Sequence, residues 1–308
     1  MSTDSLITWH ADASPIAGRR VLVHAFTGFL DAGGATATAA KLLQASEPRL
    51  LATVDIDQVL DYRARRPVLT FVTDHFAAVD MPQIALHEVR DGGGTPFLLL
   101  TGPEPDYQWQ RFSGAVLDIV RRTGVELTVG LSAVPWPAPH TRPLGVTIHG
   151  NVPELVSSPH AMVGNIQVPG HIGGLLELLL GEAGEQAIGI ATHVPHYLGQ
   201  FDYPPAAIAA LEALGRVTDL RIEVQDLRAA ASRAEGETKP KSGGWSRKLL
   251  GGVKADSAEG ARAGEGEEGT AAESKPLSRE EILARATDDA ALNAMLGASP
   301  AALAAATK

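Results

Sequence analysis

Ten histidines provide candidates for metal binding and proton transfer in this sequence. His193 and His196 form an H-x-x-H pair, which must share one helix face to bind a metal together. The pair instead ends a predicted strand, where its side chains point to opposite faces, and Pro195 prevents a helix. His140 lies in a separate loop, so the sequence leaves open a site shared by His140, His193 and Asp202. We expect no metal site and no cofactor.

A serine nucleophile is the second chemical possibility. Residues 130–134 (GLSAV) resemble a G-x-S-x-G nucleophile elbow around Ser132, but Val134 replaces the second glycine. A serine at a strand end usually forms local hydrogen bonds. The sequence has no cysteine, which excludes a thiolate nucleophile and a disulfide framework. Because no catalytic set is complete, we interpret the chain as a binding protein rather than an enzyme.

A glycine-rich turn, residues 28–34, links a predicted strand to a predicted helix. Such helix N-termini attract anions, because free N–H groups point outward. The spacing is not G-x-G-x-x-G, no Walker lysine follows, and Asp31 would repel a phosphate. We predict that Asp31 caps the helix and that Gly28 and Gly33 permit close packing of strand and helix.

A proline-rich loop, residues 135–143 (PWPAPHTRP), follows the predicted strand at 125–134. Ligands of open α/β sheets bind beyond the carboxyl ends of strands, so Trp136, His140 and Arg142 could line a small-molecule site. Aromatic and arginine side chains also suit the centre of a protein interface. We favour the interface.

Two carboxylates, Asp55 and Asp57, are expected on one face of a strand through their i, i+2 spacing. Like charges this close repel unless a cation lies near. Arg63, Arg65 and Arg66 follow and could supply it. We interpret the segment as a strand-end loop held by ion pairs, each of which adds little stability.

The elements that must position these residues alternate between strand and helix, which predicts a mostly parallel sheet with helices on both faces. The turn Asp91-Gly92-Gly93-Gly94 predicts a hairpin, which makes the sheet mixed. Strands are expected at residues 19–26, 50–56, 85–89, 96–101, 125–134, 145–149 and 187–194. Helices are expected at residues 34–45, 107–123, 170–180, 205–214 and 224–233.

The composition fits a globular protein and excludes several partners. The 308 residues are 44% hydrophobic and 20% charged, with a formal net charge of −10. Acidity argues against nucleic-acid binding, and only 5% of residues are aromatic, which leaves few rings for stacking bases. The first residues lack a signal-peptide pattern, and no apolar run is long enough to cross a membrane. We therefore predict a cytoplasmic protein without membrane association.

The chain divides into three parts by composition. Residues 1–234 form the predicted α/β domain, and residues 235–276 are rich in glycine and charge, which predicts a flexible linker. Residues 277–308 are expected to contain a helix, with Ser278 as N-cap and Glu281 completing a capping box. This helix could act as a recruitment element on a flexible tether.

Several of these segments together resemble the PAC2 family (proteasome assembly chaperone 2-like), in particular its actinobacterial branch. The resembling stretches cover roughly residues 20–230 and include VLVHAFTGFLDAGGATATAAKLL, GPEPDYQWQRF, VGLSAVPWPAPHTRPLGVTIHG and IATHVPHYLGQFDYPPAA. The resemblance implies a three-layer α/β/α core similar to nucleoside phosphorylases, and a homo-oligomer, for which we assume a trimer. The resemblance implies no set of catalytic residues at positions of this sequence.

Some members of the family are chaperones that help to assemble proteasome α-subunits. In some of these, a C-terminal hydrophobic-Tyr-any-residue motif docks on the proteasome, whereas this sequence ends Ala306-Thr307-Lys308. We do not expect docking of that kind. The resemblance implies a non-enzymatic protein that binds other proteins, including subunits of protein complexes, through residues near 28–31 and 136–142.

The alternative hypothesis is a small-molecule binding protein or enzyme on a phosphorylase-like core. His140, Arg142 and His193 would then bind a nucleoside or an anion, with the turn at Gly28 nearby. The two hypotheses differ in whether these side chains meet in one pocket. The candidate ligand or interface residues are Gly28, Asp31, Gly33, Trp136, His140, Arg142 and His193.

Overall fold

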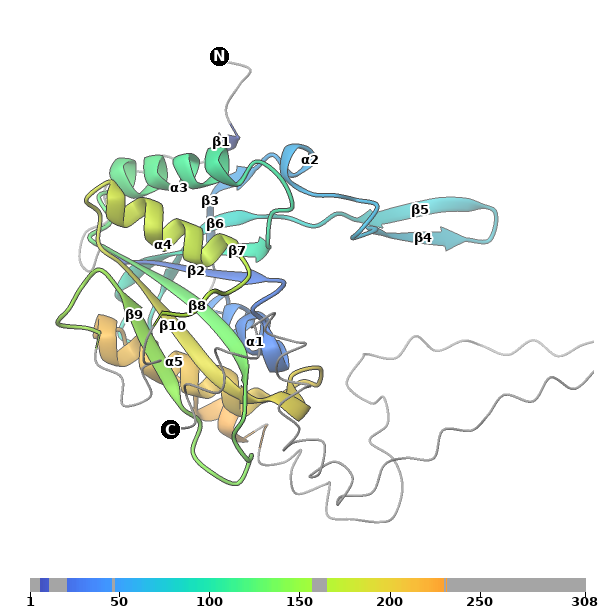
Figure 1. Ribbon diagram of the computed structural model, residues 1–308. Helices are drawn as coiled ribbons and strands as arrows, with labels where there is room; N and C mark the ends of the chain where they lie inside the picture. The colour runs from blue at the N-terminus through green and yellow to red at the C-terminus, as the bar shows by residue number, and fades with distance from the viewer. Residues whose placement is uncertain (1–5, 11–20, 46–47, 157–164, 230, 232–308) are drawn as a thin grey trace, which may run out of the picture.

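The computed structural model describes residues 6–10, 21–45, 48–156, 165–229 and 231, and it has three layers (Figure 1). An eight-stranded sheet in the order β1-β3-β6-β7-β2-β8-β10-β9 forms the middle layer. This arrangement confirms the predicted three-layer α/β/α architecture with a mixed sheet. The predicted linker, residues 235–276, and the predicted terminal helix lie outside the described residues.

The four central strands run parallel, and antiparallel strands flank them on both sides. The central strands are β7 (Pro96–Pro103), β2 (Val21–Thr27), β8 (Leu127–Trp136) and β10 (Ala187–Pro195). The flanking strands are β1 (Ile7–Trp9), β3 (Arg49–Val54), β6 (Ala85–Arg90) and β9 (Val146–Gly150). Every residue of β10 is buried, as expected for a parallel strand that is covered on both faces.

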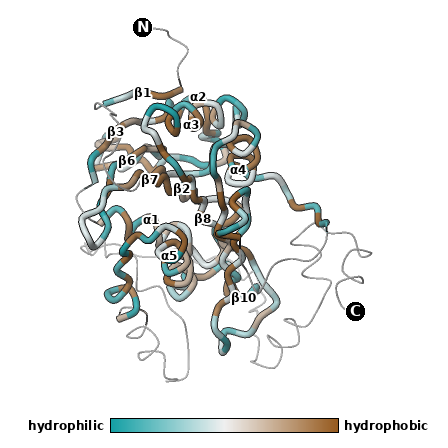
Figure 2. The backbone as a smooth tube through the Cα atoms, turned by 90° about the vertical axis from the view of Figure 1, so that its left-hand side faces the viewer, coloured by the Kyte–Doolittle hydropathy of each residue, from teal (hydrophilic) through white to brown (hydrophobic). Residues whose placement is uncertain are grey.

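Four helices cover the sheet, two on each face (Figure 2). The helices are α1 (Ala35–Leu43), α3 (Trp109–Thr123), α4 (Ile172–Glu182) and α5 (Pro204–Thr218), and residues 225–229 add a short helical segment. Alternation along β2 produces the two cores, because Leu22 packs in the cluster that includes Phe112 of α3, whereas Val23 packs with Leu211 of α5. Among the described residues, no helix combines the length and apolar character needed to cross a membrane.

A separate two-stranded hairpin, which we call the arm, projects from the body (Figure 1). It consists of β4 (Val68–Val72) and β5 (His75–Asp80), paired antiparallel. The sequence analysis did not predict this hairpin, although two apolar runs flank a turn at Thr73 and Asp74.

The prediction that Asp55 and Asp57 share a strand face is wrong. Strand β3 ends at Val54, and Asp55 is the N-cap of the short helix α2 (Ile56–Val59). The Asp55 carboxylate accepts a hydrogen bond from the Asp57 backbone N–H at 3.2 Å. The cap ends the strand before the two carboxylates can line up on it.

Candidate interaction site

The predicted site residues lie at one edge of the sheet, where the parallel strands β2, β8 and β10 end. Because the carboxyl ends of parallel strands meet at one edge, three loops come together there. We call them the carboxyl-edge loops, defined as residues 28–34 after β2, residues 137–145 after β8 and residues 196–203 after β10. Six of the seven candidate residues lie in these loops or at the strand end beside them, and His193 lies near the end of β10.

Direct hydrogen bonds join the carboxyl-edge loops. The Gly33 N–H donates to the Gly199 carbonyl, and the Tyr203 N–H donates to the Gly33 carbonyl, each at 2.8 Å. The Tyr197 hydroxyl lies 2.8 Å from both the backbone nitrogen and Nδ1 of His140. Gly33 has a φ of +69°, and a Cβ there would lie 3.0 Å from the Tyr203 Cβ. Glycine is therefore required where the loops meet.

Gly34 is the N-cap residue of helix α1, and the carboxylate of Asp31, three residues earlier, supplies the side-chain cap that the sequence predicts. Its Oδ1 accepts hydrogen bonds from the backbone N–H groups of Thr36 at 2.7 Å and Ala37 at 3.4 Å. Burial raises the pKa of Asp31 above its ordinary value, and these hydrogen bonds offset part of that rise. Through these hydrogen bonds, the Asp31 carboxylate fixes the orientation of the first carboxyl-edge loop relative to α1.

The three side chains of the small-molecule hypothesis have different environments. His193 is buried, with its ring stacked on Trp136 at 3.9 Å between centroids and its Nε2 2.9 Å from Thr147 Oγ1. His140 and Arg142 are exposed. Two cavities of about 540 and 360 Å³ lie elsewhere and include none of these residues. Trp136 covers one face of the buried His193 ring, so His193 does not share an open surface with the exposed His140 and Arg142.

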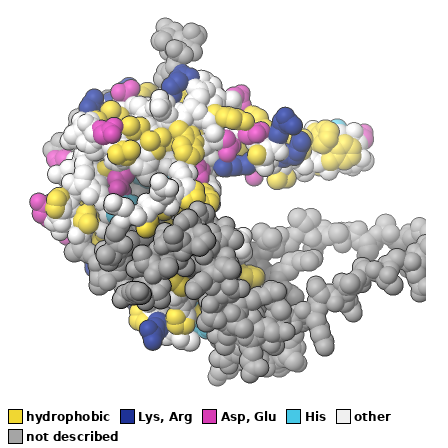
Figure 3. Space-filling view, in the orientation of Figure 1, with side chains coloured by type: hydrophobic (Ala, Val, Ile, Leu, Met, Phe, Trp, Pro, Cys, Tyr) yellow, Lys and Arg dark blue, Asp and Glu magenta, His cyan; other side chains and the backbone are white. Residues whose placement is uncertain are grey.

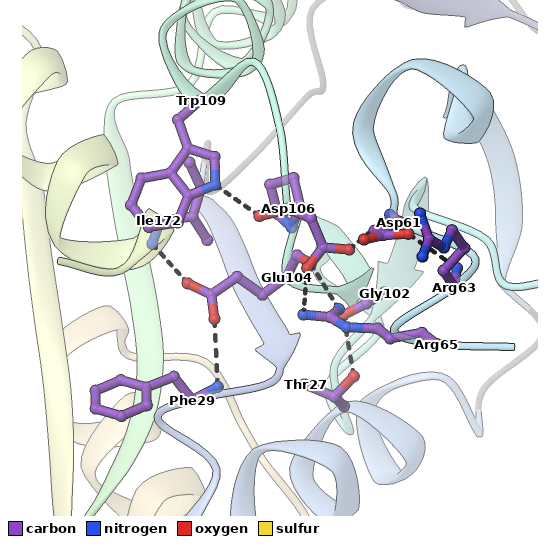
Figure 4. Close-up of polar contacts among 11 residues, drawn as sticks. Thr27, Phe29, Asp61, Arg63, Arg65, Gly102, Glu104, Asp106, Trp109 and Ile172 are labelled. Carbon is purple, nitrogen blue, oxygen red and sulfur yellow. Dashed lines mark hydrogen bonds and ion pairs between the residues drawn. The ribbon is translucent and has the colours of Figure 1, made fainter. Parts of the chain in front are cut away.

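Glu104, which the sequence analysis did not single out, connects three elements at this edge (Figure 4). Its buried carboxylate accepts a hydrogen bond from the Phe29 N–H at 3.2 Å and from the Ile172 N–H at 2.8 Å. Ile172 is the first residue of α4, so the anion lies at a helix N-terminus. A Cβ on Gly28 would lie 2.8 Å from Glu104 Oε2, which explains the glycine at that position.

The root of the arm is fixed to the same edge (Figure 4). Arg65 donates to the Glu104 carbonyl at 2.7 Å and pairs with Asp106 at 3.0 Å. Asp106 also accepts a hydrogen bond from the Asp61 N–H at 2.8 Å. The backbone N–H of Arg63 binds the Asp61 carboxylate and lowers its pKa. Arg65 therefore orients the arm instead of neutralising the pair Asp55 and Asp57.

A row of residues beneath α4 contains two histidines and two glycines. Strand register places His24, Gly130, Gly189 and His149 side by side on β2, β8, β10 and β9. The glycines leave room for the rings, because a Cβ on Gly130 would stand 2.6 Å from His24 Cε1. Burial and, to a smaller extent, the nearby His171 lower the pKa of His24 to about 4. His24 is therefore neutral at pH 7.

The carboxyl edge also exposes large aromatic side chains. Phe29 in the first loop is 55% exposed, and Phe201 in the third loop is 62% exposed. Tyr107, which follows β7, is exposed as well. Since the hydrogen bonds described above hold both loops, these rings are presented on a rigid surface. Exposed aromatic residues on rigid backbone are typical of protein interfaces.

The fold and this edge define a three-layer α/β/α protein with an aromatic surface beyond its parallel strands. The model of the PAC2 family matches residues 25–240, so the chain belongs to the PAC2 family. No curated protein matches the chain.

Solved structures of actinobacterial proteins share the fold. A Mycobacterium tuberculosis protein of unknown function, Rv2714, is 43% identical over 77% of this chain and 82% of that chain, with a TM-score of 0.71. A Corynebacterium glutamicum protein of unknown function is 36% identical over 75% and 88%, with a TM-score of 0.71. The M. tuberculosis proteasome-assembly chaperone homologue Rv2125 is 28% identical over 72% and 97%, with a TM-score of 0.65.

Proposed function

We propose that this chain is a non-enzymatic protein-binding protein of the assembly-chaperone type, which uses its carboxyl edge to hold subunits of a protein complex. The observation that carries this proposal is the pair of exposed rings, Phe29 and Phe201, on loops joined by hydrogen bonds. Rigid aromatic side chains bind a partner with little loss of conformational entropy.

The comparison with Rv2125, described as a proteasome-assembly chaperone homologue, supports the same class of partner. We extend that description to this chain as part of the proposal, together with action in the cytoplasm as a homo-oligomer. Residues 1–234 would act as the binding domain, with the linker and C-terminal segment as a separate tether.

The environments of the histidines favour protein binding over the small-molecule alternative. The small-molecule hypothesis requires that His140, Arg142 and His193 line one open pocket, where they could bind a nucleoside or an anion together. Trp136 instead covers His193 while the other two side chains are exposed. Trp136, His140 and Arg142 then belong to the proposed protein surface, beside the aromatic pair.

Affinity capture with mass spectrometry tests the proposal. The full chain should retain specific proteins from a lysate of its source cells. The variant Phe29→Ser/Phe201→Ser should capture a much smaller amount of each of these proteins. The control is Leu178→Ser, which removes an exposed apolar side chain of α4 outside the carboxyl-edge loops. Equal capture by the double variant, or no capture above empty resin by the full chain, would contradict the proposal.

A further inference from the structure

One face of helix α1 borders a cavity whose walls are small and polar. The cavity has a volume of about 360 Å³ and lies between α1 and the carboxyl ends of β2 and β7. Ala37, Ala40, Lys41 and Gln44 line it, and their i, i+3, i+4, i+7 spacing places them on one face of the helix. Ligands of open α/β sheets bind beyond the carboxyl ends of strands, so a small-molecule site is expected in this position.

The two strands beneath the cavity change from large apolar to polar residues as they reach it. On β7, Phe97 and Leu99 pack in the core, whereas Thr101, two residues further along the same face, lines the cavity. On β2, Val23 packs in the core and Thr27 lines the cavity. Larger apolar residues at these positions would extend the core beneath α1. The chain instead leaves a hollow that contains hydroxyl groups.

The polar groups of the cavity are rich in hydrogen-bond donors. Gln44 Nε2 donates to Thr101 Oγ1 at 2.7 Å, which joins α1 to β7 and leaves the hydroxyl proton of Thr101 for another acceptor. Lys41 adds an ammonium group, which donates and does not accept. Charged acceptors such as carboxylates form the strongest hydrogen bonds with such donors. The cavity is therefore suited to a ligand with carboxylate oxygens.

His87 of β6 also lines the cavity, and the protein does not complete its hydrogen bonding. Its Nδ1 is buried without a hydrogen-bond partner among the described residues. Burial lowers the pKa of His87, so the imidazole is neutral at pH 7. Buried polar atoms without partners are rare and destabilise the folded state. The chain keeps an imidazole in this wall at a cost that a purely structural residue would not require.

The charge of the cavity is opposite to that of the protein. Among the described residues that line it, Lys41 is the one with a full charge, and none is an aspartate or glutamate. The whole chain has a formal net charge of −10, and Figure 3 shows Asp and Glu side chains scattered over the body. A local positive charge attracts a negative ligand and repels a cation.

We propose that this cavity binds a small aliphatic molecule with one carboxylate and one uncharged polar group. The carboxylate pairs with Lys41, and the polar group meets Thr101 and His87. The aliphatic part lies against the alanines of the walls, which are Ala25, Ala37, Ala40 and Ala85. At about 30 Å³ per water molecule, the volume equals about twelve waters, which suits a ligand of at most roughly that many non-hydrogen atoms.

The inference does not depend on the function proposed above. The cavity includes neither Phe29 nor Phe201, and none of the seven residues that the sequence analysis selected. Capture of a partner at the carboxyl edge and binding of a ligand in the cavity can therefore succeed or fail separately.

The first test is saturation-transfer NMR on the full chain with 3-hydroxybutyrate, 2-oxobutyrate and N-acetylglycine as probes. We expect at least one probe to bind at millimolar concentration. The amide of that probe has the same shape without the charge and should bind about tenfold more weakly, as expected for the loss of one charge-assisted hydrogen bond. Absence of binding by every carboxylate, or equal binding of acid and amide, would overturn the proposal.

The second test removes the positive charge. Lys41 is exposed, so Lys41→Gln should leave the fold intact while it weakens binding of the probe about tenfold. The matched control is Arg216→Gln, which removes an exposed positive charge from α5 outside the cavity and should bind as the full chain does. Unchanged binding by Lys41→Gln, or an equal loss in both variants, would contradict a site at Lys41.

The third test fills the cavity. Ala37→Leu adds an apolar side chain from α1 and should abolish binding, whereas Thr38→Leu, on the same helix but outside the cavity, should leave it unchanged. Melting temperatures of both variants show whether the fold is kept. Full binding by a folded Ala37→Leu variant would place the ligand elsewhere and overturn the proposal.

His87→Phe separates a role in binding from a structural role. The variant removes the buried nitrogen that lacks a partner, so without ligand it should melt at least as high as the full chain. It should also bind the probe more weakly, because the polar group of the ligand loses the imidazole. A raised melting temperature with unchanged binding would overturn the assignment of His87 to the site.

Discussion

His24 shows how a single buried side chain can make the stability of the molecule depend on pH. Its ring lies beneath the first turn of α4, with Gly173 on one side and Gly130 on the other. Burial, with a smaller contribution from His171, lowers its pKa from 6.5 to about 4. The folded protein therefore holds a neutral imidazole at a pH where the unfolded chain takes up a proton.

We expect the stability of the protein to fall between pH 6.5 and pH 4. The folded-state pKa of His24 lies below its unfolded value, so this contribution is complete above pH 6.5 and lost as the pH falls. A shift of this size is worth about 3 kcal/mol. Urea unfolding at a series of pH values measures it, and His24→Gln should show a weaker dependence over the same range.

The appropriate control is His140→Gln, because that histidine is exposed and should leave the pH dependence unchanged. An identical slope in the full chain and in His24→Gln would show that His24 does not cause the effect.

At the scale of secondary-structure elements, Glu104 joins the end of β7 to the loop after β2 and to the start of α4. Its two oxygens accept from N–H groups of residues 75 and 68 positions away in the sequence. Each such bond is charge-assisted and so stronger than a neutral one. One carboxylate thus sets the relative positions of the first carboxyl-edge loop and of a helix on the opposite face from α1.

Glu104→Gln should destabilise the fold by about 1–3 kcal/mol. A neutral amide can accept one of the two hydrogen bonds, but its NH₂ group then faces the other backbone N–H, which is left without an acceptor. The free energy of unfolding in urea measures the loss. Glu212→Gln, which changes a partly exposed ion pair with Arg228, should change stability by less than about 0.5 kcal/mol. A similar loss in both variants would contradict the role assigned to Glu104.

The parts of the fold that could be predicted are those that bury a periodic apolar pattern. The strands near 21–27, 127–136 and 187–195 were recognisable because strands covered on both faces are continuously apolar. The Asp31 cap was recognisable because it acts on residues close in sequence. Both signals are local, so a single sequence is sufficient to find them.

The missed features depend on contacts that sequence spacing does not show. Glu104 stands alone between two prolines, and its partners Phe29 and Ile172 are distant in the chain. The row of His24 and His149 depends on the order of strands in the sheet. The arm was missed because its apolar residues are exposed, whereas apolar runs were interpreted only as parts of a buried core.

On the scale of the whole molecule, the carboxyl edge and the arm are built from different elements but share one hydrogen-bond network. The carboxyl edge presents Phe29 and Phe201 on loops, whereas the arm carries its exposed apolar side chains on β4 and β5. The Glu104 network connects them, because it holds both the first loop and the root of the arm through Arg65.

The exposed apolar side chains of the arm favour association between copies of the chain, so the melting temperature of the full chain should depend on protein concentration. An oligomer stabilises the folded state by mass action, so a hundredfold increase in concentration should raise the melting temperature by on the order of 5 °C. Phe71→Ser/Phe76→Ser should melt at one temperature throughout that range, close to that of the dilute full chain, because both phenylalanines are exposed and lie outside the two buried cores. Differential scanning calorimetry over the concentration series makes the measurement. An arm variant that melts far below the dilute full chain would instead assign the arm to the stability of the single chain.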